Sequence, residues 1–100
     1  MTALTIDLQD GFMDDSVIIR VDGDLVLEDD HVSTRLQTGF ARSVQCDTAD
    51  SAVTAEVELP GRGQQTTIGI DPHDTAYLGL SLDATGHIAS RVSGSMFGYL

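Results

Sequence analysis

The fold is decided by the stretch Val17-Ile18-Ile19-Arg20-Val21-Asp22-Gly23-Asp24-Leu25. Val17, Ile19 and Val21 alternate with the residues between them, which is the period of a β-strand that buries one face. An Asp-Gly dipeptide then separates this apolar run from the next, and both residues tolerate the positive φ that a type I′ turn requires. The stretch therefore predicts a tight hairpin that joins strands 16–21 and 24–28.

The same alternation continues on both sides of this hairpin. Further strands are predicted at 4–8, 53–59, 66–70, 77–82 and 87–93, with turn residues at 10–11, 60–63, 71–72 and 83–86. Roughly eight short strands, with a turn every 8–12 residues, are typical of a sandwich. We expect an all-β fold: a single two-sheet antiparallel β-sandwich domain over residues 1–100.

Residues 32–44 are compatible with two structures. Apolar residues recur every four positions, as on one face of a helix, at Val32, Leu36, Phe40 and Val44. Phe40, Val44 and Cys46 also share one phase of a strand alternation. Poor helix formers such as Gly39 favour a strand, and a short helix within 31–45 is the alternative.

The charge balance narrows the choice of partners. Sixteen acidic residues face five basic ones, giving a net charge of −11. Such a chain repels phosphate backbones and anionic membrane surfaces, so we expect neither a nucleic-acid nor a membrane partner. The acidity has two explanations: an anionic face for a basic partner or a divalent cation, or an adaptation to solubility and salt.

Cysteine content and the first residues indicate the compartment. Cys46 is the only cysteine, so an intrachain disulfide is excluded. The first residues lack the positive region of a signal peptide, and no apolar run approaches the roughly 18 residues of a membrane helix. We expect a soluble, cytoplasmic protein.

The densest group of potential metal ligands lies just after the predicted hairpin. Glu28, Asp30 and His31 are the candidates for a divalent-cation site, because carboxylates suit Ca²⁺ and an imidazole suits transition metals. The site would need further acids from the first loop, at Asp7, Asp10, Asp14 and Asp15. The alternative for 28–31 is a solvated loop that leaves the hairpin. We expect no cofactor.

No catalytic residue is predicted. Asp71-Pro72-His73-Asp74 pairs a histidine with carboxylates, but Asp-Pro at its start is typical of a type I turn. Cys46 with His31, His73 or His87 could form a nucleophile and base, yet its phase with Phe40 and Val44 favours an inert core thiol. The chain has neither a Gly-x-Ser-x-Gly elbow nor a phosphate-binding glycine loop.

The C-terminal residues of this sequence are apolar. Met96, Phe97, Tyr99 and Leu100 predict either a final docked strand or an interface with another subunit. A homodimer that buries this segment would enlarge a small core, although the charge of −11 on each copy opposes it at low salt.

Three functions remain as hypotheses. The first is a non-enzymatic acidic β-sandwich that acts as a protein-interaction module or as a small oligomeric subunit. The second is a divalent-cation (Ca-type) binding module that uses the acidic loops. The third is a small hydrolase or isomerase whose site forms from residues distant in sequence. The first hypothesis is favoured because the sequence lacks a catalytic motif and has few aromatic residues.

Overall fold

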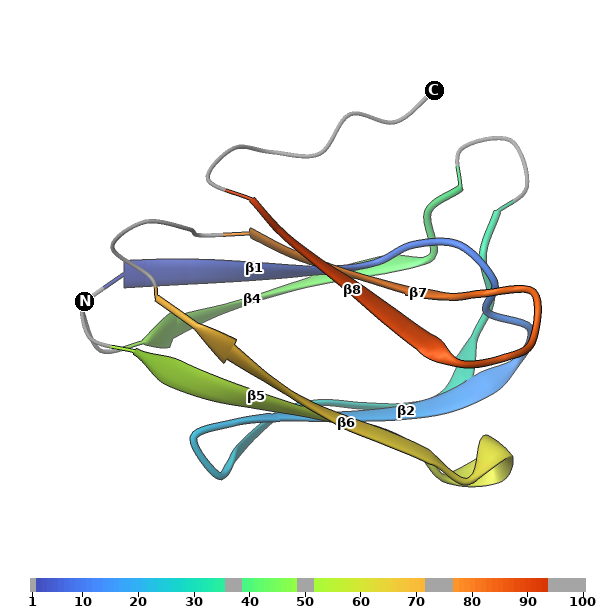
Figure 1. Cartoon of the computed structure of the whole chain (residues 1–100), viewed down its shortest axis with the longest axis horizontal. Helices are drawn as coiled ribbons and strands as arrows, with labels where there is room; N and C mark the ends of the chain where they lie inside the picture. Colours follow the sequence, from blue (N-terminus) through green and yellow to red (C-terminus); the bar gives the residue numbers. More distant parts are fainter. Residues whose placement is uncertain (1, 36–38, 49–51, 72–76, 94–100) are drawn as a thin grey trace.

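The computed structural model describes residues 2–35, 39–48, 52–71 and 77–93, which form two stacked four-stranded sheets (Figure 1). One sheet has the order β4-β1-β7-β8, and the other has the order β3-β2-β5-β6. The strand bounds are β1 Thr2–Leu8, β2 Asp15–Val21, β3 Asp24–Val32, β4 Arg42–Thr48, β5 Val53–Leu59, β6 Gln64–Ile70, β7 Tyr77–Leu82 and β8 Ile88–Ser93. The predicted all-β, two-sheet sandwich is confirmed.

The alternating apolar residues face one another between the sheets. Leu4, Ile6 and Leu8 of β1 are fully buried, and the inward-facing residues of β2, β5 and β7 follow the same rule. These side chains form one buried cluster between the two layers. Burying one face of each sheet against the other is the step that stabilises a sandwich of this size.

The deciding hairpin forms as the sequence predicts. Val21 pairs with Asp24 across the turn, and Ile18 pairs with Glu28. Asp22 and Gly23 both adopt positive φ, at 50° and 87°, as a type I′ turn requires.

β3 is longer than predicted and continues to Val32 instead of leaving as a loop. Between the pairs Val17–Asp29 and Asp15–Val32, β3 contains two residues where β2 contains one. This β-bulge absorbs the extra residue and lets Val32 return to the core, where it is buried. The acids 28–30 therefore lie on a strand.

The ambiguous segment forms a strand over its second half. Arg35 and Phe40 make an isolated antiparallel bridge, and β4 begins at Arg42. Val44 and Cys46 are half-buried on the inner side of β4, while Gln45 between them is exposed. The described residues of 31–45 contain no helix. The four-residue recurrence was misleading because Val32 and Val44 belong to strands of different sheets.

One strand pairing departs from the antiparallel pattern. β1 pairs with β4 in antiparallel orientation but with β7 in parallel orientation, with Ile6 opposite Leu78. All other strand pairs among the described residues are antiparallel.

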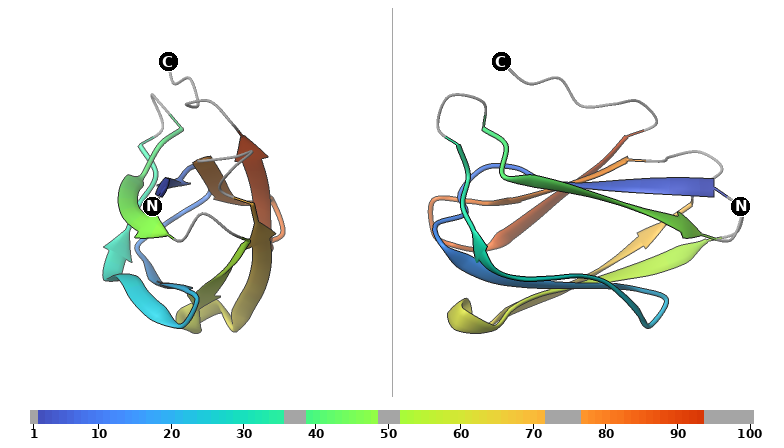
Figure 2. Two further views of the ribbon diagram at one scale, coloured as in Figure 1. Left: turned by 90° about the vertical axis from the view of Figure 1, so that its left-hand side faces the viewer. Right: turned by 180° about the vertical axis from the view of Figure 1, so that it is seen from behind.

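Several of the described connections between strands lie together at one end of the sandwich. The connection from β1 to β2 crosses from one sheet to the other there, beside the residues that follow β3 (Figure 2). The β5–β6 connection, which includes the short 3₁₀ helix η1 (Pro60–Arg62), and the β7–β8 turn lie at the same end (right side of Figure 1). We call this end, formed by residues 9–14, 33–35, 60–63 and 83–87, the loop end. The β2–β3 turn at Asp22–Gly23 lies at the opposite end, which we call the hairpin end.

Candidate functional site

The loop 9–14 is fixed to β7 by its backbone. The amide of Gln9 donates to the carbonyl of Leu80 at 2.7 Å, and the amide of Leu82 donates to the carbonyl of Asp10 at 2.8 Å. Gly11, with φ of 94°, lies directly against Leu82, because a Cβ at position 11 would be 2.4 Å from the Leu82 carbonyl oxygen. Only glycine combines this φ with this close approach.

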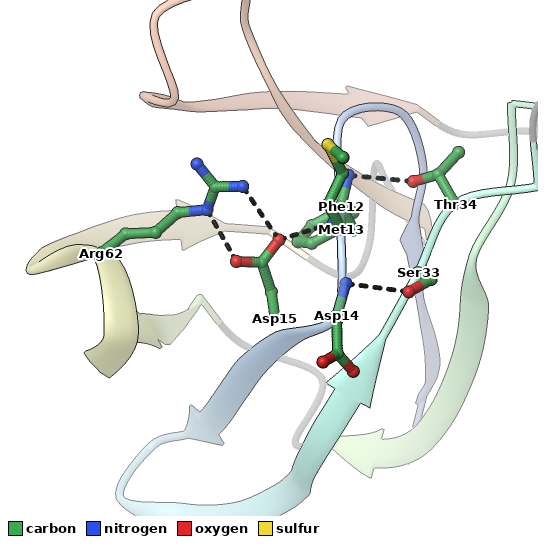
Figure 3. A network of polar contacts seen from close by, with 7 residues as sticks. All are labelled: Phe12, Met13, Asp14, Asp15, Ser33, Thr34 and Arg62. Atoms are coloured by element: carbon green, nitrogen blue, oxygen red, sulfur yellow. Dashed lines mark hydrogen bonds and ion pairs between the residues drawn. The ribbon is translucent and has the colours of Figure 1, made fainter.

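The other side of the loop is fixed to the residues that follow β3. The amide of Phe12 donates to Oγ1 of Thr34 at 3.1 Å, and the amide of Thr34 donates back to the Phe12 carbonyl at 2.9 Å. The amide of Asp14 donates to Oγ of Ser33 at 2.8 Å. Figure 3 shows the loop between Ser33 and Thr34 on one side and Arg62 on the other.

An ion pair closes the loop at its junction with β2. Asp15, 8% exposed, accepts hydrogen bonds from Nε and Nη2 of Arg62 at 2.7 and 3.2 Å, and from the Met13 amide at 2.8 Å. Burial alone would raise the pKa of Asp15, but these hydrogen bonds hold the pKa below its usual value. The ionised carboxylate therefore joins the loop to η1, across a gap of 47 residues in the sequence.

This fixed loop exposes one large apolar side chain. Met13 is 79% exposed, whereas its neighbour Phe12 is 3% exposed and belongs to the core. Beside Met13 lies a pocket of about 540 Å³ with a largely apolar surface. Its described lining residues are Asp10, Gly11, Phe12, Met13, Asp14, Ser33 and Thr34. The arrangement can accept an apolar side chain from another molecule.

A histidine and a carboxylate meet at the rim of this pocket. Nδ1 of His31 lies 2.8 Å from Oδ1 of Asp14, and both side chains are exposed. The hydrogen bond to Asp14 and the Asp14 charge raise the pKa of His31. Asp14 adopts φ of 53°, a conformation that aspartate tolerates better than most residues.

The predicted metal ligands do not converge in the part of the chain that is described. Glu28 and Asp30 are exposed on β3, and His31 contacts Asp14. Asp29 forms an ion pair with Arg42 of β4 and so links the edges of the two sheets. Within the described residues, no three His, Cys, Asp or Glu side chains come close enough together to hold a metal ion.

The other residues singled out in the sequence are not among the described residues that line the pocket. Asp7 is buried on β1 and accepts a hydrogen bond from Oγ of Ser43 at 2.8 Å. Partial burial and the charge of Asp47 raise the pKa of the Cys46 thiol, which disfavours the nucleophilic thiolate. Residues 72–74 of the predicted turn, and the interface candidates Met96, Phe97, Tyr99 and Leu100, lie outside the described residues.

Sequence reasoning did not find the pocket or Met13. The available signal was an apolar pair, Phe12-Met13, enclosed by Asp10-Gly11 and Asp14-Asp15 in a connection that is otherwise polar. Alternation shows neither which of the two is exposed nor that Ser33 and Thr34 lie beside them.

The comparisons with known proteins give no relative. No family model, curated protein or solved structure matches the chain. Among the described residues there is no helix with the length and apolar character needed to cross a membrane.

Proposed function

We propose that this chain is a protein-interaction module that binds its partner at the loop end, through Met13 and the pocket beside it. One observation carries the proposal. The loop 9–14 is held by hydrogen bonds on both sides, yet it leaves Met13 79% exposed next to a largely apolar pocket.

Pre-organisation supports this role. A loop that is already fixed loses little conformational freedom when a partner binds, so more of the interaction energy appears as affinity. Covering a methionine side chain removes apolar surface from water, worth about 1.5–3 kcal/mol when burial is complete. Methionine is also enriched at binding surfaces, because its flexible thioether adapts to the partner.

Photo-crosslinking tests the proposal. Benzoylphenylalanine is placed at position 13, or at position 25 as the matched control, and the protein is irradiated in the cells that naturally produce it. Leu25 suits this purpose because it is also apolar and 54% exposed, but it lies at the hairpin end. We expect an adduct with a second protein from position 13 and none from position 25.

Competition with protein that lacks the crosslinker tests whether the adduct is specific. Excess wild-type protein should abolish the adduct, whereas excess Met13→Glu protein should not. Equal adducts from both positions, or none from position 13, would contradict the proposal. An adduct of the chain with a second copy of itself would replace it with the small oligomeric subunit.

A further inference from the structure

We propose that the partner presents a basic segment with one apolar side chain: the apolar side chain enters the pocket beside Met13, and a lysine or arginine next to it pairs with Asp10 and Asp14. This inference rests on the proposed function and specifies the partner of the same site.

The apolar part follows from the pocket itself. Its volume of about 540 Å³ falls within the range of about 300–1,000 Å³ found for pockets that hold small ligands. It therefore has room for one large aliphatic side chain. Met13 supplies most of its exposed apolar surface, because Phe12 is only 3% exposed and lies in the core beneath. The hydrogen bonds that hold the loop backbone keep Met13 beside the pocket.

The basic part follows from the charges around the pocket. The charged residues among its described lining are two carboxylates, Asp10 and Asp14. Two basic side chains near the pocket are already paired, Arg62 with Asp15 and His31 with Asp14, and Arg35 is exposed at the same end. A partner's cation would therefore pair with Asp14 in place of the His31 ring. The net charge of −11 adds a long-range attraction for cations. A segment with a positive charge beside its apolar side chain complements both features.

A second copy of this chain is a poorer occupant. A two-fold symmetric contact through Met13 would bring the Asp10 and Asp14 carboxylates of both copies to one interface. Each copy also carries a net charge of −11. This repulsion favours a partner of opposite charge.

Peptide titration of the full ¹⁵N-labelled chain, followed by NMR, tests the inference. Three nine-residue peptides have a central leucine flanked by lysine and arginine, by serine, or by glutamate; a fourth is the basic peptide with serine in place of leucine. We expect the basic leucine peptide to shift the amides of residues 10–14 and 33–34. Affinity should fall about 3-fold or more between 50 and 300 mM salt, and about 10-fold when leucine is replaced by serine.

Variants locate the charge contact. Asp14→Asn keeps a residue that tolerates positive φ and removes the charge, so it should weaken binding about 2- to 5-fold. Asp24→Asn is the matched control, because Asp24 is an exposed carboxylate at the hairpin end and should leave the affinity unchanged.

The outcomes separate the two proposals. Equal binding of the acidic and basic peptides, or shifts confined to residues outside the loop end, would overturn the basic partner. If the position-13 crosslinks to a second protein persist in that case, the interaction module stands with a partner of different chemistry. Self-association of the free chain through residues 10–14 would overturn the basic partner in favour of a second copy.

Discussion

The two ends of the sandwich contain similar residues, but different contacts hold those residues in place. Each contains an aspartate in the left-handed conformation, Asp14 with φ of 53° and Asp22 with φ of 50°. Each also exposes an apolar side chain, Met13 or Leu25. At the hairpin end, Asp22 and Gly23 complete a turn between adjacent strands. At the loop end, the conformation depends on residues from several distant segments.

This difference is the reason why we place the proposed binding site at the loop end. The hairpin forms from its own two turn residues, supported by the Asp22 carboxylate, which accepts a hydrogen bond from the Thr54 amide at 2.8 Å. The loop 9–14 instead contacts the residues after β3, the end of β7 and, through Asp15, η1. The conformation of this loop therefore depends on the folded protein. The pocket beside it, about 540 Å³, is larger and more apolar than the pocket of about 260 Å³ beside the hairpin turn.

Replacing one glycine by alanine at each end should give the largest difference in stability between the two ends. In Gly11→Ala the new Cβ would lie 2.4 Å from the Leu82 carbonyl oxygen, whereas in Gly23→Ala it would have no neighbour within 4 Å. Both substitutions also strain a positive φ, which costs about 1 kcal/mol. We expect Gly23→Ala to destabilise by about 1 kcal/mol and Gly11→Ala by about 3 kcal/mol or more, measured by urea unfolding.

Circular dichroism of both variants before unfolding serves as the control, since each should retain the β spectrum at low temperature. Equal losses of stability would show that the loop 9–14 moves away from β7 at little cost. The rigidity on which the proposed binding site depends would then be absent.

Removing the charge of Arg62 should have the next largest effect on stability. Arg62→Met breaks the two hydrogen bonds to the buried carboxylate of Asp15, and we expect a loss of about 1–2 kcal/mol. Arg20→Met is the matched control: its ion pair with Glu58 spans 3.5 Å between side chains that are each about one-third exposed. Such a pair contributes less than about 1 kcal/mol.

The pH dependence identifies the carboxylate responsible. Because the pKa of Asp15 is lowered in the folded protein, the stabilisation is fully present above its unfolded value of about 3.9 and is lost as the pH falls through the folded value. The stability difference between wild type and Arg62→Met should therefore be constant above about pH 5 and shrink below about pH 4. A difference independent of pH would assign the effect to packing of the arginine stem.

The same contrast explains what the sequence could predict. The hairpin and the strand Val53–Leu59 depend on neighbouring residues, and both appear as predicted. The parallel pairing of β1 with β7 brings together segments about 70 residues apart, and alternation fixes only the face of a strand and not its neighbour. β3 extends through 28–31 because of a bulge opposite β2. The charged residues of this run do not indicate such a bulge.

The candidate site could not be predicted from the sequence for the same reason. Four acids of the first loop region were recognised, but their partners were not. Asp7 contacts Ser43, Asp14 contacts His31, and Asp15 contacts Arg62. Each pairing depends on the packing of two sheets, so a cluster that looks like a cation site in sequence is divided among separate partners.

The smallest expected effect concerns the rim of the pocket. Asp14→Asn should lower the pKa of His31 towards its ordinary value, because the hydrogen bond and the charge of Asp14 are what raise it. An NMR titration of the His31 ring in both proteins measures this shift, with Asp24→Asn as the matched charge control. Because the raised pKa stabilises the folded protein only while His31 is protonated, this contribution is present below the unfolded pKa of about 6.5 and disappears as the pH rises through the folded value. An unchanged His31 pKa in Asp14→Asn would show that the two side chains do not interact in solution. Asp14 would then be free to meet a partner's cation without first releasing the imidazole.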